Sequence, residues 1–213
     1  MVGGSMGGYQ AVEWCAMEPV LINNLFLIAT SSRETPWGKA IHATQRMAIE
    51  TDSTWTENSL DAGMNGLKTA RAIGMITYRS FKTFGATQND EVHDLQTTYK
   101  AASYVQYQGD KLAKRFNAFS YWYLTNAMDS HNLARGRAAT VAEVLQRFKQ
   151  NTLVIGISSD IISPLQEQIF LKENIPQSQL VIIDSLYGHD GFLIETDQIT
   201  THVKAWLAHV NVD

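Results

Sequence analysis

The feature that most constrains the fold is a serine set among four glycines near the start of the chain. The sequence runs Met-Val-Gly-Gly-Ser-Met-Gly-Gly, with one strand-forming valine before the glycines and Ser5 between them. After it, Ala11 and Cys15 recur at helical i, i+4 spacing, and the helix must end before Pro19 because a residue preceding proline resists helical geometry. A continuous apolar run over residues 25–30 then predicts a strand buried on both faces, as in a parallel sheet.

A strand, a glycine-flanked serine and a helix in this order match Gly-x-Ser-x-Gly, the nucleophile elbow. In that turn the serine takes a strained backbone conformation, and small neighbours let the strand and the helix pass closely. Two other glycine motifs fit less well. A phosphate-binding loop would end in Gly-Lys-Ser or Gly-Lys-Thr, and a dinucleotide fingerprint would need a glycine where Ser5 stands. A flexible glycine turn remains the alternative unless partners for Ser5 follow in the right order.

Candidate partners do follow. A serine nucleophile needs a base, and the base needs an acid, in the chain order Ser, Asp or Glu, His for this elbow. Residues 151–157 predict a buried strand that is followed at once by Asp160. Residues 179–184 predict a further strand that leads to His189. Because the carboxyl ends of parallel strands share one edge of a sheet, we predict Ser5, Asp160 and His189 as nucleophile, acid and base.

Each partner also has a simpler structural interpretation. Asp160 could cap the helix that follows it, which is a common task for aspartate. His189 could occupy an ordinary turn in its Gly-His-Asp-Gly setting. The coincidence of an elbow, an acid and a histidine, each at a strand end and in the required order, favours the triad.

The middle of the chain does not look like sheet. Helical periodicity predicts helices over residues 40–50, 66–78, 96–116 and 140–149. An insertion of this kind usually forms a helical lid over the active-site face, where it shapes the pocket and excludes water. We therefore assign residues 1–32 and 151–213 to an α/β core and residues 33–150 to the lid.

Composition narrows the class of function. The 17 Lys and Arg against 21 Asp and Glu leave a formal net charge of −4, with no basic field for nucleic acid. No apolar run reaches the ~18 residues of a membrane span, and no signal-peptide pattern begins the chain. A single cysteine, Cys15, excludes an internal disulfide and suits a reducing cytoplasm. We expect a cytoplasmic enzyme with neither nucleic-acid nor membrane partners and with no metal.

A set of short motifs makes the chain resemble the homoserine O-acetyltransferase family. The motifs are GGSMGGYQAVEW, IATSSR, WGKA, ITYRS, YQGDK, GISSDI and YGHDGFL, and the match runs from Val2 to about Leu207. The resemblance implies the α/β-hydrolase fold, here its C-terminal part. That part comprises parallel strands 5–8 of the fold, with the helical lid inserted between strands 6 and 7.

The resemblance also implies a reaction, in which Ser5 takes an acetyl group from acetyl-CoA and passes it to the hydroxyl of L-homoserine, a step of methionine biosynthesis. Acetyl-CoA is then a co-substrate, and no bound cofactor is expected. The backbone N–H of Met6 would stabilise the oxyanion, while Arg79 and Asp190 would hold the carboxylate and the ammonium group of homoserine. For Arg79, an ion pair between lid and core is the alternative.

The family's chains begin well before the elbow, with the rest of the sheet and a loop that supplies a second oxyanion donor. We therefore expect a C-terminal portion with a complete triad but an incomplete oxyanion hole. Its candidate partners are small-molecule substrates, a second copy bound through the lid, and a separate N-terminal segment. Three alternatives stay open: a serine esterase with the same triad, a transferase that uses succinyl-CoA or serine, and an inactive fragment that only binds.

Overall fold

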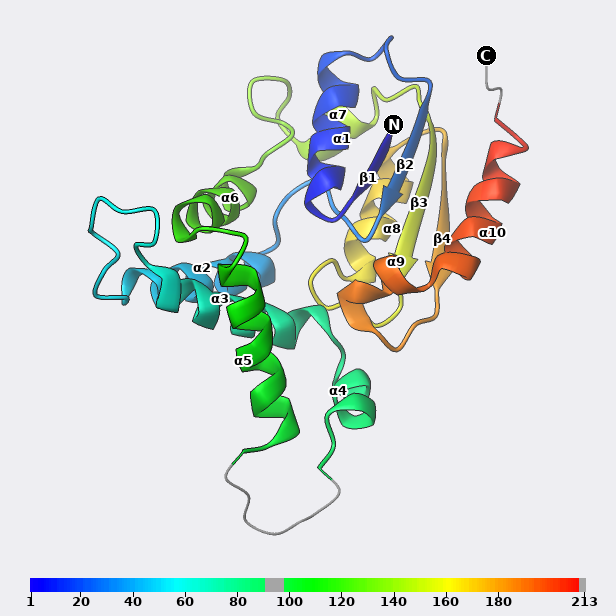
Figure 1. Ribbon diagram of the computed structural model, residues 1–213. Coiled ribbons are helices and arrows are strands. Elements are labelled where there is room, and N and C mark those ends of the chain that lie inside the picture. The colour runs from blue at the N-terminus through cyan, green and yellow to red at the C-terminus, as the bar shows by residue number, and fades with distance from the viewer. Residues whose placement is uncertain (91–97, 211–213) are drawn as a thin grey trace. The chain divides into compact units, whose positions relative to one another are not determined.

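The centre of the fold is a parallel sheet. The computed structural model describes residues 1–90 and 98–210. In this described part of the chain, four strands form one sheet in the order β1-β2-β3-β4 (Figure 1). They are β1 (Val2–Gly4), β2 (Asn24–Ile28), β3 (Asn151–Ile157) and β4 (Ser178–Ile183). All three pairings are parallel, so the loops that follow β1, β3 and β4 leave from the same edge of the sheet.

Both faces of this sheet are covered by helices, as the continuous apolar strands predict. Helices α1 (Met6–Met17), α7 (Val141–Leu145) and α8 (Leu165–Asn174) pack on one face, and α10 (Thr196–Leu207) packs on the other (Figure 1). Alternate residues of β2 divide between the two faces. Leu25 and Leu27 join the cluster beneath α1, whereas Phe26 and Ile28 join the cluster beneath α10.

Contacts divide the chain into two compact units. The core unit comprises residues 1–34 and 131–213, and the helical unit comprises residues 35–130. The helical insertion is thus shorter than residues 33–150, the range predicted from the sequence. The reason is that residues 131–150 bury apolar side chains, among them Leu133, Val144 and Phe148, in the cluster beneath α1.

The helical unit contains α2 (Pro36–Glu50), α3 (Met64–Tyr78), α4 (Phe81–Thr87), α5 (Lys100–Ala113) and α6 (Ala118–Ser130). The predicted helices over 40–50 and 66–78 fall within α2 and α3. The predicted helix over 96–116 shortens to α5, with residues 96 and 97 outside the described residues, and the one over 140–149 shortens to α7 of the core unit.

Two helices of this unit were not predicted. Helix α6 has apolar and aromatic residues around its whole circumference, so its sequence shows no single apolar stripe. Helix α4 has only seven residues and depends on a local cap, in which the Ser80 hydroxyl accepts a hydrogen bond from the Thr83 N–H at 3.1 Å. No helix among the described residues has the length and the apolar character needed to cross a membrane.

A buried apolar cluster and polar ties hold the helical unit together. Ile49 of α2, Leu67 of α3 and Leu112 of α5 form the centre of the cluster. Asp129 of α6 accepts hydrogen bonds from α2, at 2.7 Å from His42 Nδ1 and 2.6 Å from Arg46 Nη2. The insertion therefore has an interior of its own.

The turn after α2 supplies the cap for α3. Asp52 Oδ2 accepts hydrogen bonds from the backbone N–H groups of Asn65 (2.8 Å) and Gly66 (3.0 Å), in the first turn of α3. Its Oδ1 accepts one from the Thr54 N–H at 3.0 Å. These bonds stabilise the charged carboxylate, so they lower the pKa of Asp52 from 3.8 to about 2. The bond from the Thr54 N–H has the largest effect.

We expect the Asp52→Ala variant to lose about 1 kcal/mol of stability at neutral pH, the usual effect of removing a helix cap. Because the folded-state pKa is depressed, the contribution of the carboxylate is present above about pH 4 and is lost as the pH falls towards 2. Urea denaturation of both proteins across this range measures the difference. Asp61→Ala, at an exposed aspartate of the same loop, is the control. A difference between Asp52→Ala and the unsubstituted protein that stays constant with pH contradicts the account.

Candidate active site

Ser5 occupies a strained turn between β1 and α1. Its backbone angles are φ 51° and ψ −125°, a region that non-glycine residues rarely adopt. Hydrogen bonds on both sides hold the turn. The Ser5 N–H donates to the Ile28 carbonyl at 3.1 Å, and the Ser5 carbonyl accepts from the Thr30 hydroxyl at 2.7 Å. The strained turn is thus held by the end of the neighbouring strand, β2, and by the loop that follows it.

Two of the glycines are needed because other backbone or side-chain atoms pass very close to them. A Cβ added at Gly3 would lie 2.5 Å from the Gly7 carbonyl oxygen, where β1 and α1 cross. A Cβ at Gly8 would lie 2.1 Å from the Thr30 hydroxyl oxygen, the same group that holds Ser5. At Gly7, in contrast, an added Cβ would meet no atom within 4 Å. The sequence motif therefore combines two glycines required by packing with at least one that is not.

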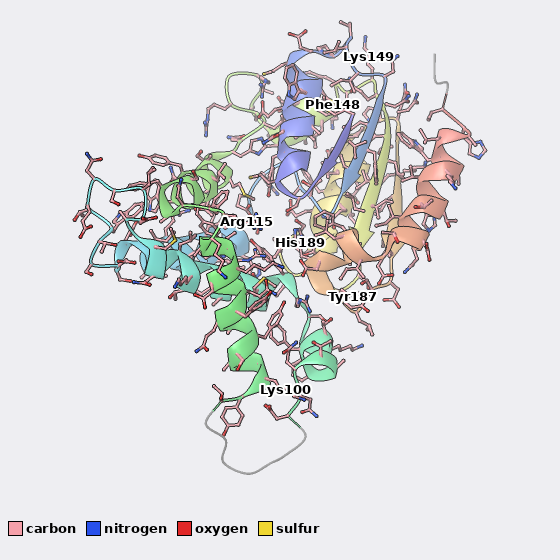
Figure 2. All side chains as sticks on the ribbon, viewed as in Figure 1. Lys100, Arg115, Phe148, Lys149, Tyr187 and His189 are labelled. Atoms are coloured by element: carbon pink, nitrogen blue, oxygen red, sulfur yellow. The ribbon has the colours of Figure 1, made fainter. Side chains whose placement is uncertain are left out.

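The structure brings Ser5, His189 and Asp160 together. His189 Nε2 lies 2.8 Å from Ser5 Oγ, and His189 Nδ1 lies 2.7 Å from Asp160 Oδ2. His189 and Asp160 are each only 5% exposed. Figure 2 shows His189 at the carboxyl edge of the sheet, at the opposite end of the core unit from Phe148 and Lys149.

Asp160 makes both kinds of contact that its sequence position predicts, one set with the turn that follows it and one with His189. Its Oδ1 accepts hydrogen bonds from the backbone N–H groups of Ile162 (2.8 Å) and Ser163 (2.9 Å), so it does order the turn that leads to α8. Its Oδ2 remains available for His189. The backbone bonds fix the carboxylate in the orientation that presents this second oxygen to the imidazole.

Two serines outside the predicted triad, Ser158 and Ser159, connect the loop of Asp160 to the loop of His189. Ser159 Oγ donates to the Ser185 carbonyl at 2.6 Å and accepts from the Gly188 N–H at 2.9 Å. Ser158 Oγ donates to Asp184 Oδ1 at 2.8 Å. Two adjacent serines directly after a buried strand were the available signal, since such residues commonly bond to neighbouring backbone.

The remaining predicted site residues differ in placement. Met6 is the first residue of α1, so its N–H belongs to the first helical turn beside Ser5. Asp190 follows His189 in a short 3-10 turn, Gly188–Asp190, ahead of α9 (Gly191–Ile194), and is half-buried. Arg79 belongs to the helical unit, at the C-terminal end of α3, with its guanidinium carbon 5.1 Å from the centroid of the Tyr104 ring.

This geometry suits a serine nucleophile. An ionised Asp160 accepts a hydrogen bond from His189 Nδ1–H, which leaves Nε2 as the acceptor for the Ser5 hydroxyl. The imidazole can then take the serine proton, and the carboxylate can stabilise the imidazolium that forms. Among the described residues, no group of three or more His, Cys, Asp or Glu side chains is arranged to hold a metal ion.

The chain belongs to the α/β-hydrolase fold family, whose model matches residues 1–196. Among curated proteins it is similar to homoserine O-acetyltransferase of Cyclobacterium marinum, with 41% identity over 211 residues. That alignment covers 99% of this chain and 60% of the relative. The chain thus spans about three fifths of the length of the curated relative that it matches.

Solved structures support the same fold. Homoserine O-acetyltransferase from Bacillus anthracis superposes with a TM-score of 0.85 at 18% identity, and the match covers 100% of this chain and 60% of that one. Esterase E22 also gives a TM-score of 0.85 at 18% identity, over 97% of this chain and 60% of that one. A transferase and an esterase resemble the chain equally well, so the fold does not distinguish between the two activities.

The geometry of the turn predicts opposite effects of alanine substitution at two neighbouring glycines, Gly7 and Gly8. We expect Gly8→Ala to displace Thr30 and Ser5, and to reduce the rate at which a fluorophosphonate labels Ser5 by at least tenfold. Gly7→Ala is the matched control, since its added methyl meets open space and alanine favours the helix by about 1 kcal/mol. Mass spectrometry of the labelled serine and thermal unfolding of both variants measure the difference. Equal labelling of the two variants would contradict this account of the turn.

Proposed function

We propose that the protein transfers an acetyl group from acetyl-CoA to the hydroxyl of L-homoserine, through an acetyl-Ser5 intermediate. The observation that carries this proposal is the 41% identity, along 99% of the chain, to a protein named homoserine O-acetyltransferase. The hydrogen-bonded series Ser5–His189–Asp160 supports it, because acyl transfer needs an activated nucleophile. The cytoplasm remains the expected location, and a homodimer formed through the helical unit remains a prediction.

In the first half-reaction, Ser5 Oγ attacks the thioester carbonyl carbon while His189 Nε2 accepts the serine proton. The carbonyl oxygen becomes an oxyanion, for which the backbone N–H of Met6 is the proposed donor. The C–S bond then breaks, and the coenzyme A sulfur leaves with the proton from His189. Acetyl-Ser5 remains, and Asp160 stabilises the imidazolium while it exists.

In the second half-reaction, the homoserine hydroxyl gives its proton to His189 Nε2 and attacks the acetyl carbonyl carbon. The bond to Ser5 Oγ breaks, the serine regains the proton, and O-acetylhomoserine leaves. The same imidazole therefore acts once as base and once as acid in each half-reaction. Arg79 is proposed to hold the carboxylate of homoserine, and Asp190 its ammonium group.

A serine esterase is the second candidate, because the same three side chains would activate water instead of homoserine. The similarity in fold to esterase E22 keeps this candidate open. The two activities differ only in which nucleophile resolves the acyl-enzyme. Whether the acceptor can outcompete water is decided by groups that bind homoserine, not by the triad.

Release of free thiol from acetyl-CoA tests the proposal. We expect steady release only when homoserine is present, with one O-acetylhomoserine formed per thiol, and loss of activity by about 10⁴-fold or more in Ser5→Ala. Equal release without homoserine would identify a hydrolase, and no fluorophosphonate labelling of Ser5 would identify an inactive protein. Parallel assays with succinyl-CoA and with serine identify the acyl donor and the acceptor.

Arg79 offers a separate test of the acceptor. We expect Arg79→Lys to raise the KM for homoserine about tenfold, because an ammonium cannot bind a carboxylate in bidentate fashion, and to leave labelling of Ser5 unchanged. Arg71→Lys is the matched control, since Arg71 lies on the same helix and also stacks on a tyrosine, with its guanidinium carbon 5.4 Å from the Tyr78 ring centroid. An equal rise in KM in both variants would show that Arg79 has no specific role.

A further inference from the structure

The two points where the chain crosses between its units lie side by side on the core unit. The chain leaves the core unit after Glu34 and returns to it at His131. Next to these points, Arg33 and Asn132 form an isolated antiparallel bridge. The exit and the return of the helical insertion are thus held together as a pair, although nearly 100 residues separate them in sequence.

Helix α1 contacts each crossing with one side chain. Tyr9 Oη donates a hydrogen bond to Glu34 Oε2 at 3.1 Å, where both residues are buried. One turn later, Glu13 Oε1 accepts from His131 Nε2 at 3.0 Å. The i, i+4 spacing places Tyr9 and Glu13 on one face of the helix, and the Tyr9 and His131 rings lie 5.0 Å apart. We refer to Tyr9, Glu13, Glu34 and His131 as the crossing clamp.

An ion pair between Glu13 and Arg137 strengthens the clamp at the point where the chain returns to the core unit. Glu13 Oε2 also forms an ion pair with Arg137 Nη2 at 2.7 Å, and Arg137 Nη1 donates to the Leu133 carbonyl at 2.9 Å. Burial lowers the pKa of His131, so a neutral imidazole donates its Nε2–H to the carboxylate near pH 7. The Glu13 carboxylate therefore fixes the first residues after the insertion from two directions.

The helix that holds the crossings also carries the nucleophile. Helix α1 begins at Met6, directly after Ser5, so Tyr9 and Glu13 stand one and two turns from the reacting hydroxyl. Their hydrogen bonds run to the crossings and to Arg137, whereas Ser5 is bonded to His189. The orientation of Ser5 and the anchoring of the insertion thus share a single rigid element.

We propose that Tyr9 and Glu13 are positioning residues, which hold the core residues at both crossings, Glu34 and His131, on the nucleophile helix, so that acceptor binding depends on them while acylation of Ser5 does not. The inference rests on the proposed function, in which the insertion supplies Arg79 for homoserine. Its physical basis is that hydrogen bonds to Glu34 and His131 restrict the backbone at both crossings, where the chain enters and leaves the insertion. The clamp acts through the insertion and touches no reacting atom.

Two conservative variants test the clamp. Glu13→Gln keeps the shape but removes the charge, and Tyr9→Phe removes only the hydroxyl. We expect each to raise the KM for homoserine roughly 10–150-fold, the effect of losing one hydrogen bond to a charged group, with fluorophosphonate labelling of Ser5 within about twofold of the unsubstituted protein. The controls are Glu18→Gln, at an exposed glutamate that ends the same helix, and Tyr107→Phe, at an exposed tyrosine. Both should leave the KM for homoserine and the labelling of Ser5 unchanged.

Amide hydrogen exchange gives a readout that does not depend on the substrate. Exchange in residues 31–35 and 131–135 should accelerate in both variants and in neither control. Unchanged exchange at the two crossings overturns the clamp, and so does a parallel loss of labelling and transfer, which would mean a merely structural role. If the unsubstituted protein transfers no acetyl group to homoserine but the variants accelerate exchange, the proposed acceptor is wrong and the clamp stands.

Discussion

The site depends on a single strained turn. Ser5 holds its backbone at φ 51° with hydrogen bonds on both sides, to the Ile28 carbonyl at the end of β2 and from the Thr30 hydroxyl just beyond it. Thr30 also lies close to Gly8, so α1 packs tightly against the residues that follow β2. Strain of this kind persists only where the surroundings over-determine it, and here the sheet does so.

The rest of the site lies at one edge of the sheet, and local hydrogen bonds hold its loops in place. The parallel order brings the ends of β3 and β4 to the edge where β1 ends. That alone would leave the loops free to move. Ser159 joins the two loops, and the backbone bonds to Asp160 Oδ1 orient the carboxylate, so the Asp160–His189 pair is preorganised. Such second-layer bonds hold functional groups within the narrow geometry that chemistry requires.

The helical insertion adds a second level of organisation. It has its own apolar cluster and its own polar ties, yet both of its connections meet the core unit at one pair of residues, Arg33 and Asn132. Because Tyr9 and Glu13 reach these connections from α1, one helix serves both the nucleophile and the anchoring of the insertion.

The order of strand, glycine turn, helix and later strands could be predicted from the sequence, because apolar runs and turn residues encode local structure. The choice of Ser5, Asp160 and His189 followed from that order, since parallel strands must end at one edge. The sequence could not indicate that residues 131–150 belong to the core, because their apolar residues suit either unit. The hydrogen bonds of Ser159, Tyr9 and Glu13 could not be predicted from the sequence either. Their partners are residues distant in sequence or backbone atoms, which no sequence pattern identifies. Local pattern determined most of the elements and the candidate triad, and only tertiary packing decided which polar groups meet, because hydrogen bonds act over a few ångströms of space and not over sequence separation.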